Sequence, residues 1–267
     1  MEFLQRSMSK LTNLCVNKDA KIATIRAFVV AIIIGGLLLL LMSFSADDAP
    51  DFTAYEAGDE RKQAFFSYFV PLIEAENTAL LEVRNELMDL REKRDRLSFF
   101  ERMSVTGLAE QYEVEDFDLG DSDDWDLLIR RIDIVPPSLA LAQAANESAW
   151  GTSRFALEGN NYYGHWCFAP GCGIVPSARP EGATHEVADF ASPQQSVERY
   201  IHNLNHHPAY RELRLRREQL RENDNPITGL ALATELQHYS ERGEEYVAEL
   251  QSMIRFNELT EFDTAYF

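Results

Sequence analysis

The longest apolar run of the chain extends from residue 27 to residue 46 and contains no charged side chain. About 20 residues at helical rise span the hydrocarbon core of a bilayer, so this run predicts a transmembrane helix. Five basic residues precede it within 1–26 and aspartates follow it directly, which by the positive-inside rule places the N-terminus in the cytoplasm. A cleaved signal peptide ending near residues 43–45 is the alternative, but the long apolar run favours a retained anchor.

After this run the pattern becomes acidic and then helical. Residues 47–60 hold six acidic side chains and no basic one, which is typical of a solvated spacer. From residue 60 to residue 96 apolar side chains recur at helical spacing, and Pro71 is expected to kink or break this helix. We therefore interpret residues 47–125 as an acidic spacer and a helical region.

Residues 126–267 combine helical and strand-like patterns. Pro136-Pro137 and Ser138 predict the start of a helix, because the Ser138 hydroxyl can cap free N–H groups of the first turn. The stretch 173–190 predicts two short strands around a turn at residues 180–182. Further helices are expected after Ser192 and Tyr210 and over residues 226–238 and 244–257. The pattern indicates a mainly α-helical domain with a small β-hairpin lobe.

One carboxylate, Glu147, lies within the helix that starts near Ser138. At helical spacing, Gln143 and Trp150 fall on the same face as Glu147. Burial beside an indole and the negative end of the helix dipole both disfavour the carboxylate anion and so raise its pKa. Glu147 is therefore a candidate general acid; the alternative is an ordinary solvated glutamate on a helix surface.

The segment from Ser138 to Gly164, SLALAQAANESAWGTSRFALEGNNYYG, resembles the catalytic-acid segment of bacterial glucosaminidases that cleave peptidoglycan. These enzymes are of the glycoside hydrolase family 73 type, and the similarity is greatest to their Bax-type, membrane-anchored members. The resemblance covers roughly the last half of the chain. It implies a lysozyme-like catalytic domain over residues 126–267 and assigns the general acid to Glu147.

Two cysteines, Cys167 and Cys172, are five positions apart with a Pro-Gly turn between them. Outside a bacterial inner membrane this spacing suits a disulfide that closes a hairpin. A zinc site would need two more ligands besides the cysteines. His165 is close, but the sequence offers no second pair of ligands, so we expect neither a metal nor a cofactor.

Glycoside hydrolysis ordinarily uses two carboxylates. In the family that this chain resembles, a hairpin glutamate faces the acid, and Glu186 is the first candidate here, ahead of Glu181 and Asp189. The usual triplet before the hairpin turn is missing, and a solvent-facing Glu186 is an equal alternative. Tyr239 matches the family's downstream tyrosine, because HYSERGEEY resembles its YATDPxY element.

Several residues near Glu147 in the sequence are candidates for binding the sugar. Aromatic faces stack on sugar rings, although tryptophan and tyrosine also fill cores. The candidates are Gln143, Trp150, Asn161, Tyr163 and Trp166.

Acidic residues outnumber basic ones by 44 to 25, which argues against nucleic acid as a partner. Eight acidic side chains fall in residues 113–126, but they lack the spacing of a calcium loop. The Arg-rich helix after Tyr210 alternates with glutamates and is interpreted as an exposed, salt-paired face; a patch for an anionic wall polymer is the alternative.

The pattern and the resemblance together predict a single-pass inner-membrane protein whose periplasmic domain hydrolyses peptidoglycan glycan strands after N-acetylglucosamine. A lytic transglycosylase is one alternative, although its usual motif lacks the GTSxFAxxGNN continuation present in this chain. A non-catalytic wall-binding scaffold is the other.

Overall fold

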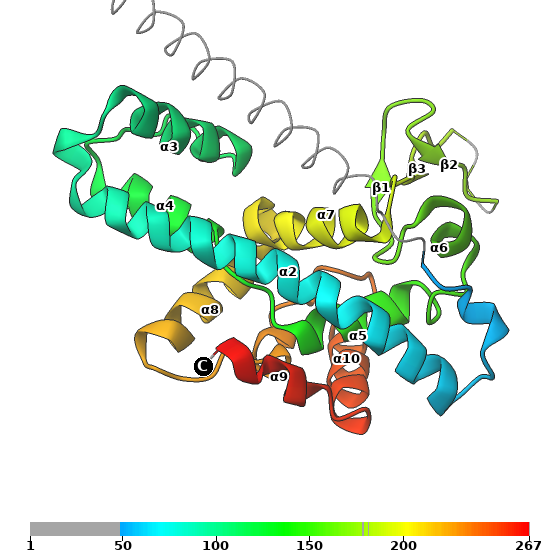
Figure 1. The fold of residues 1–267 in the computed structure, drawn as a ribbon. Helices are drawn as coiled ribbons and strands as arrows, with labels where there is room; N and C mark the ends of the chain where they lie inside the picture. The colour runs from blue at the N-terminus through cyan, green and yellow to red at the C-terminus, as the bar shows by residue number, and fades with distance from the viewer. Residues whose placement is uncertain (1–48, 178, 181, 267) are drawn as a thin grey trace, which may run out of the picture. The chain divides into compact units, whose positions relative to one another are not determined.

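Helices dominate the part of the chain that the computed structural model describes, residues 49–177, 179–180 and 182–266. The α-helices are α2 (Asp59–Glu92), α3 (Phe99–Gln111), α4 (Ser122–Arg131), α5 (Pro137–Glu147), α6 (Arg154–Gly159), α7 (Pro193–His206), α8 (Arg211–Glu222), α9 (Gly229–Ala233) and α10 (Glu244–Phe256). Short 3-10 helices are η1 (Phe52–Ala54), η2 (Arg94–Arg96), η3 (Pro208–Tyr210) and η4 (Leu259–Tyr266). With one small sheet, this confirms the predicted mainly α-helical fold with a β lobe (Figure 1).

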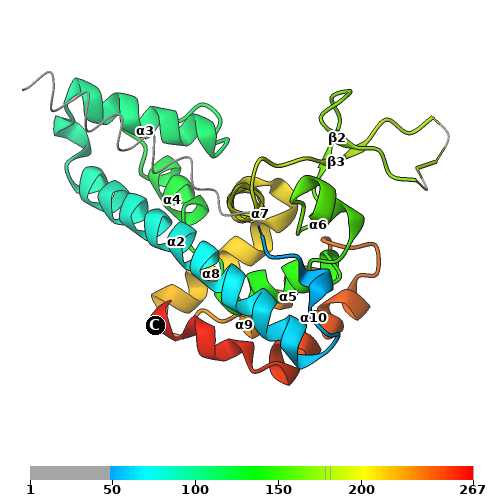
Figure 2. The same ribbon diagram turned by 45° about the vertical axis from the view of Figure 1, so that its right-hand side comes forward.

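The central helix is α5, and all of its residues except the last two, Asn146 and Glu147, are buried. Helices α2, α9 and α10 and the C-terminal η4 pack around it (Figures 1 and 2). Four alanines between residues 140 and 145 allow this close approach, because the separation of packed helices depends on the side chains at the contact. This packing on several sides fixes the position of α5, whose last residue is Glu147.

The start of α5 is held from the other end of the sequence. Asp263 accepts hydrogen bonds from the backbone N–H and the hydroxyl of Ser138, at 2.9 and 2.7 Å, and from the N–H of Gly229 at 3.1 Å. The prediction that Ser138 caps this helix is therefore wrong, since its hydroxyl donates to Asp263. A carboxylate at this position complements the positive end of the helix dipole.

The long helix α2 continues through Pro71, so of the expected kink or break, the break does not occur. Proline removes the hydrogen bond that would reach Ser67, but both residues lie on the exposed side, where water can satisfy the freed carbonyl. The opposite side packs into the core through residues including Phe65, Phe69 and Ile73.

A buried ionic cluster fixes the connection between α4 and α5. Arg221 donates to both carboxylate oxygens of Asp133, at 2.6 and 3.1 Å, and Arg217 donates to the Ile134 carbonyl at 2.6 Å. Burial acts to raise the pKa of Asp133, but the surrounding guanidinium groups keep it below its usual value. Since Arg214 and Arg217 are almost completely buried, the interpretation of α8 as an exposed face is wrong for these two residues.

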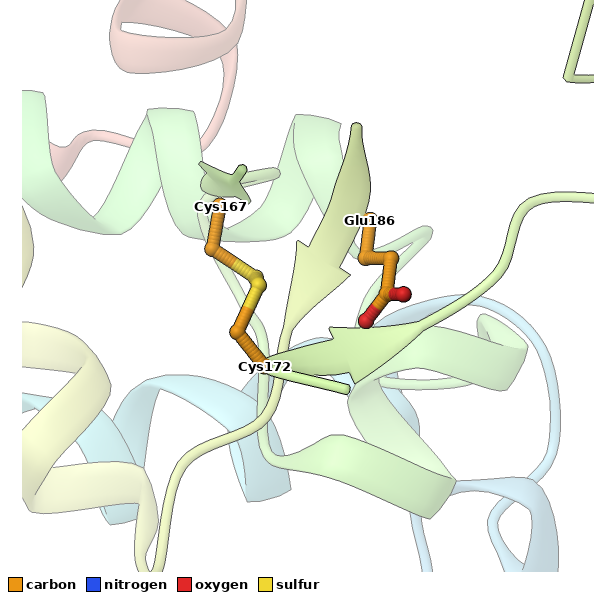
Figure 3. Close-up of side chains that lie close together, drawn as sticks. All are labelled: Cys167, Cys172 and Glu186. Atoms are coloured by element: carbon orange, nitrogen blue, oxygen red, sulfur yellow. A yellow bond between two sulfur atoms is a disulfide. The ribbon is translucent and has the colours of Figure 1, made fainter. Parts of the chain in front are cut away.

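The small lobe contains three antiparallel strands in the order β1-β3-β2. The two strands expected within residues 173–190 are present as β2 and β3, and β1 is an additional strand. They are β1 (Trp166–Cys167), β2 (Gly173–Ile174) and β3 (Glu186–Ala188). Trp166 and Ile174 both pair with Val187, from opposite sides of β3. The predicted disulfide between Cys167 and Cys172 is present and closes the loop from β1 to β2 (Figure 3).

The predicted membrane segment, residues 27–46, lies outside the residues that the structure describes. Within the described residues, no helix combines the length and the apolar character needed to cross a bilayer.

Candidate active site

Glu147 is the last residue of α5, and the chain turns sharply after it. Ala149, Trp150 and Gly151 all have positive φ, at 51°, 61° and 76°. The Ser148 hydroxyl stabilises this turn by donating to the Ala144 carbonyl at 2.6 Å and accepting from the Gly151 N–H at 2.8 Å. The carboxylate of Glu147 therefore projects from a rigid helix end.

Because the helix ends at Glu147, Trp150 does not share its helical face, and that expectation is wrong. The indole of Trp150 packs instead on α2, with ring centroids 5.9 Å from Phe65 and 5.5 Å from Phe66. The ammonium of Lys62 lies 5.5 Å from the same indole. Trp150 thus links the turn after Glu147 to α2.

A chain of three hydrogen bonds leads through the core to Glu147. The Tyr200 hydroxyl donates to Gln143 Oε1 at 2.6 Å, and Gln143 Nε2 donates to the Tyr246 hydroxyl at 2.9 Å. The Tyr246 hydroxyl donates to Glu147 Oε1 at 2.9 Å. Since an amide nitrogen only donates, the hydroxyl proton of Tyr246 is left to point at the carboxylate.

The second oxygen of Glu147 lies beside a position without a side chain. A Cβ added at Gly164 would lie 3.5 Å from Glu147 Oε2, and the φ of Gly164 is +70°, a conformation that favours glycine. One oxygen of Glu147 is thus held by Tyr246, whereas the other faces the Gly164 backbone.

Burial raises the pKa of Glu147 above the ordinary value of a glutamate. The hydrogen bonds from Tyr246 and Asn146 and the positive charge of Arg242 act in the opposite direction, and the charge of Glu249 adds to the increase. Arg242 and Glu249 are themselves ion-paired at 2.5 Å. A carboxyl group with a raised pKa keeps its proton closer to neutral pH, as a general acid requires.

Tyr246, which was not among the site residues predicted from the sequence, is therefore the tyrosine that contacts Glu147. Tyr239 lies behind it: the two rings are parallel, with centroids 5.6 Å apart, and the Tyr239 hydroxyl donates to the Tyr163 carbonyl at 2.9 Å. Both tyrosines flank the same turn in the sequence, so spacing alone offered no basis for choosing between them.

Comparison with known proteins identifies the family. A family model for the glucosaminidase domain, described as mannosyl-glycoprotein endo-beta-N-acetylglucosaminidase, matches residues 125–259. The chain belongs to the glucosaminidase family. It is also similar to the protein bax of Escherichia coli strain K12, with 34% identity over 216 residues that cover 81% of this chain and 77% of that protein. No solved structure shows a significant match.

Membership of the glucosaminidase family confirms the resemblance found in residues 138–164 and indicates a glycoside hydrolase. The domain that the family model covers begins in α4 and ends at η4. It therefore contains Glu147, Tyr246, the β lobe and the buried hydrogen-bond chain.

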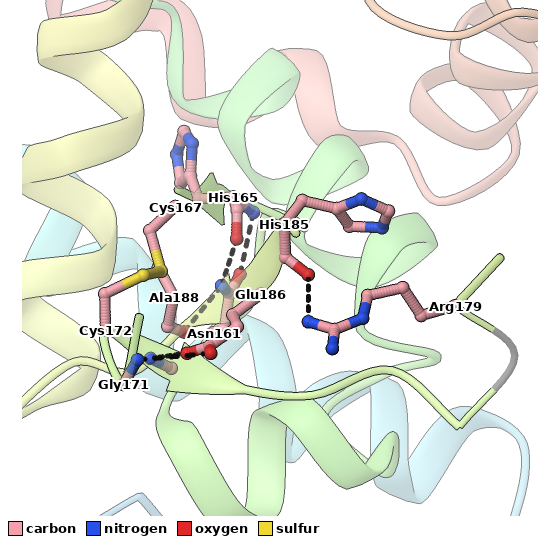
Figure 4. Close-up of a disulfide and its surroundings, with 10 residues drawn as sticks. Asn161, His165, Cys167, Gly171, Cys172, Arg179, His185, Glu186 and Ala188 are labelled. Carbon is pink, nitrogen blue, oxygen red and sulfur yellow. Dashed lines mark hydrogen bonds between the residues drawn. A yellow bond between two sulfur atoms is a disulfide. The ribbon is translucent and has the colours of Figure 1, made fainter. Parts of the chain in front are cut away.

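Three of the residues expected to bind sugar are buried in this glucosaminidase domain. Gln143 is part of the chain to Glu147, and Tyr163 stacks on Tyr200 with a centroid distance of 3.9 Å. Asn161 donates to the carbonyls of His165 and Ala188, both at 2.9 Å, and accepts from the His165 N–H at 3.0 Å (Figure 4). These contacts position the site and tie α6 to the lobe.

Trp166, in contrast, is 60% exposed at the lobe surface. Its indole stacks on the imidazole of His185, with centroids 4.2 Å apart and planes 15° apart. Among the five predicted sugar-binding residues, Trp166 offers a free aromatic face.

Glu186 is buried, and its carboxylate is hydrogen-bonded within the β lobe. Its two oxygens accept hydrogen bonds from the N–H groups of Gly171 and Gly173, at 3.1 and 2.9 Å (Figure 4). These bonds lower the pKa of Glu186. Glu186 also lies near the sulfur atoms of Cys167 and Cys172, but the sulfurs are joined and offer no free thiolate to a metal.

Proposed function

We propose that this glucosaminidase-family protein is a peptidoglycan hydrolase that cleaves the β-1,4 glycosidic bond after N-acetylglucosamine, with Glu147 as the general acid. One observation carries the proposal: a glutamate of raised pKa has one oxygen held by Tyr246 and the other beside Gly164. The family match supports the substrate class.

In this reaction the glycosidic oxygen takes the proton of Glu147 as its bond to the sugar carbon breaks. The sugar develops positive charge at that carbon, and a water molecule completes hydrolysis. Tyr246 holds the Glu147 carboxyl in place and stabilises its anion once the proton has left. The buried amide of Gln143 and the hydroxyl of Tyr200 act through Tyr246 as positioning groups.

A second group must stabilise the positive sugar carbon or activate water. Glu186 is the candidate from the hairpin, although both its oxygens already accept backbone hydrogen bonds. Glu249 is a second candidate, because its charge influences the pKa of Glu147. Two alternatives need no second carboxylate: the acetamido group of the substrate, or a water positioned by Tyr239.

The sequence and the disulfide support a proposal for the location of the protein. We propose that residues 27–46 anchor it in the bacterial inner membrane, with a cytoplasmic N-terminus and the catalytic domain in the periplasm. The Cys167–Cys172 bond supports an oxidising compartment. Peptidoglycan glycan strands are the partner within reach there.

Glu147→Gln tests the assignment of the general acid. The variant keeps size and hydrogen-bonding capacity but has no proton to transfer, so lysis of purified sacculi should fall by about 10²–10⁴-fold with nearly unchanged thermal stability. Glu222→Gln is the matched control, because Glu222 is an exposed glutamate at the end of α8. Equal lysis by Glu147→Gln and wild type would refute the role of Glu147.

The products separate hydrolysis from the alternatives. A hydrolase that cuts after N-acetylglucosamine leaves that sugar as an ordinary reducing end, which mass spectrometry of the digest identifies. A digest containing only 1,6-anhydro-muramyl ends would establish a lytic transglycosylase instead. Sacculus binding without any new ends would establish a scaffold.

A further inference from the structure

The corner between α2 and α3 lies at the opposite end of the described unit from the β lobe (Figures 1 and 2). Its outer surface, residues 91–103, comprises the end of α2, the short η2 and the start of α3. Nothing in the proposed catalytic chemistry uses this corner.

Three large apolar side chains are exposed there. Phe99, Phe100 and Met103 are 73%, 74% and 57% exposed, and their spacing places them on one face of α3. The opposite face packs inward through Val105 and Ala109, so α3 already has its buried side. The exposed side chains are therefore surplus to the packing of the fold.

The charge of the same corner is opposite in sign to that of the molecule. The chain carries a net charge of −19, but residues 91–103 hold five basic and three acidic side chains. Lys93 pairs with Glu101 at 2.6 Å and Arg91 with Asp126 at 2.7 Å. Within the described residues no ion pair is found for the other three cations, Arg94, Arg96 and Arg102.

We propose that the α2–α3 corner docks on the surface of an anionic phospholipid bilayer, with Phe99, Phe100 and Met103 at the headgroup level. Exposed aromatic side chains beside arginines are typical of helices that lie in this interface, and anionic lipids attract the cations. Most of the remaining surface is acidic and is repelled by the same bilayer. Asp118 and Asp126 also border the corner, so the three arginines and the exposed apolar side chains together favour this contact. This docking would turn the β lobe away from the bilayer, and it does not depend on the assignment of Glu147.

The test uses the full chain reconstituted in vesicles, with Cys15→Ser to remove the third cysteine of the sequence. An environment-sensitive fluorophore is attached at Thr106→Cys, one turn beyond Met103, or at Glu222→Cys as a control that is equally tethered. With phosphatidylglycerol in the vesicles, the label at position 106 should show blue-shifted emission and quenching by spin-labelled lipid. The label at position 222 should show neither.

Two substitutions separate the charge and apolar contributions. Arg94→Glu with Arg96→Glu should abolish the quenching at position 106, whereas the matched control Arg216→Glu with Arg255→Glu, at exposed arginines elsewhere, should retain it. Phe99→Ser with Phe100→Ser should reduce it severalfold. Circular dichroism melting confirms that each variant is folded.

Three outcomes would overturn the proposal. The first is an unshifted, unquenched label at position 106 on anionic vesicles. The second is equal quenching on vesicles of phosphatidylcholine alone, which would remove the role of charge. The third is a blue shift without lipid quenching, which would mean that protein, such as a second copy of the chain, covers the corner.

Discussion

At the scale of single residues, the candidate site consists of Glu147, which has one oxygen beside Gly164, and of two buried side chains that are hydrogen-bonded in a chain to its other oxygen. Gln143 and Tyr246 are hydrogen-bonded to each other, and Tyr246 donates to Glu147, so the two side chains fix the position of its carboxylate. In the proposed mechanism Glu147 therefore transfers the proton, and Gln143 and Tyr246 position its carboxyl group.

Tyr246→Phe should lower turnover and shift its pH dependence. The lost hydrogen bond lowers the pKa of Glu147 in the native protein, so its removal raises that pKa further. Because a general acid must be protonated, the alkaline limb of the pH–rate profile should move to higher pH. Turnover at the optimum should also fall, and the now unpaired Gln143 amide should cost about 1–3 kcal/mol of folding free energy.

Tyr239→Phe is the control for this shift. It removes the bond to the Tyr163 carbonyl but no contact with Glu147, so the alkaline limb should stay in place. A shift of equal size in both variants would contradict the assignment of Tyr246.

Glu186→Gln distinguishes a structural from a catalytic role. The pKa of Glu186 is lowered by its backbone hydrogen bonds, so its contribution to stability is present above the unfolded pKa of about 4.3 and is lost as pH falls through the folded value. The variant should therefore be less stable than wild type at neutral pH, with a smaller difference in acid, as measured by thermal melts. A catalytic role would add a loss of turnover by orders of magnitude with unchanged sacculus binding.

At the scale of elements, the β lobe is built from very short strands and depends on cross-links. Its strands are too short for an extensive hydrogen-bond ladder. The lobe is stabilised instead by the Cys167–Cys172 disulfide, the two hydrogen bonds to Glu186 and the amide of Asn161. A lobe held in this way can loosen without unfolding the helical core.

Cys167→Ser with Cys172→Ser should loosen this lobe selectively. The closed loop is short, so the loss of stability should lie near the low end of about 2–4 kcal/mol. Hydrogen exchange should increase at the strands while α5 and α10 remain protected, and sacculus lysis should fall. Increased exchange throughout α5 would show that the disulfide supports the whole domain.

At the scale of the whole molecule, the two ends of the described chain meet around α5. η4 near the C-terminus supplies Asp263 to the start of α5, and α2, which begins at Asp59, packs against the same helix. Glu147 is thus positioned by segments that are more than 100 residues apart.

Asp263→Asn tests this closure. The amide keeps the shape but replaces one acceptor oxygen by a donor, which then faces the N–H group of either Ser138 or Gly229. At about 1–3 kcal/mol for a lost buried partner, the melting temperature should fall by several degrees, at about 2–4 °C per kcal/mol for a domain of this size. Asp224→Asn, at an exposed aspartate, should leave it unchanged.

The sequence by itself determined the features that depend on local spacing. The helix that carries Glu147, the mainly helical fold with a small lobe, and the pairing of Cys167 with Cys172 all followed from residues close together in the chain. The family followed from the continuous segment 138–164.

Only the tertiary structure decided which distant groups meet. Tyr246 rather than Tyr239 contacts Glu147 because α10 packs against α5, and the two partners are 99 positions apart. Trp150 turns to α2, and Arg217 is buried against Asp133, because the energy of burying a side chain depends on neighbours contributed by other elements. Local patterns give the faces of helices, whereas packing selects which face and which side chain reach the site.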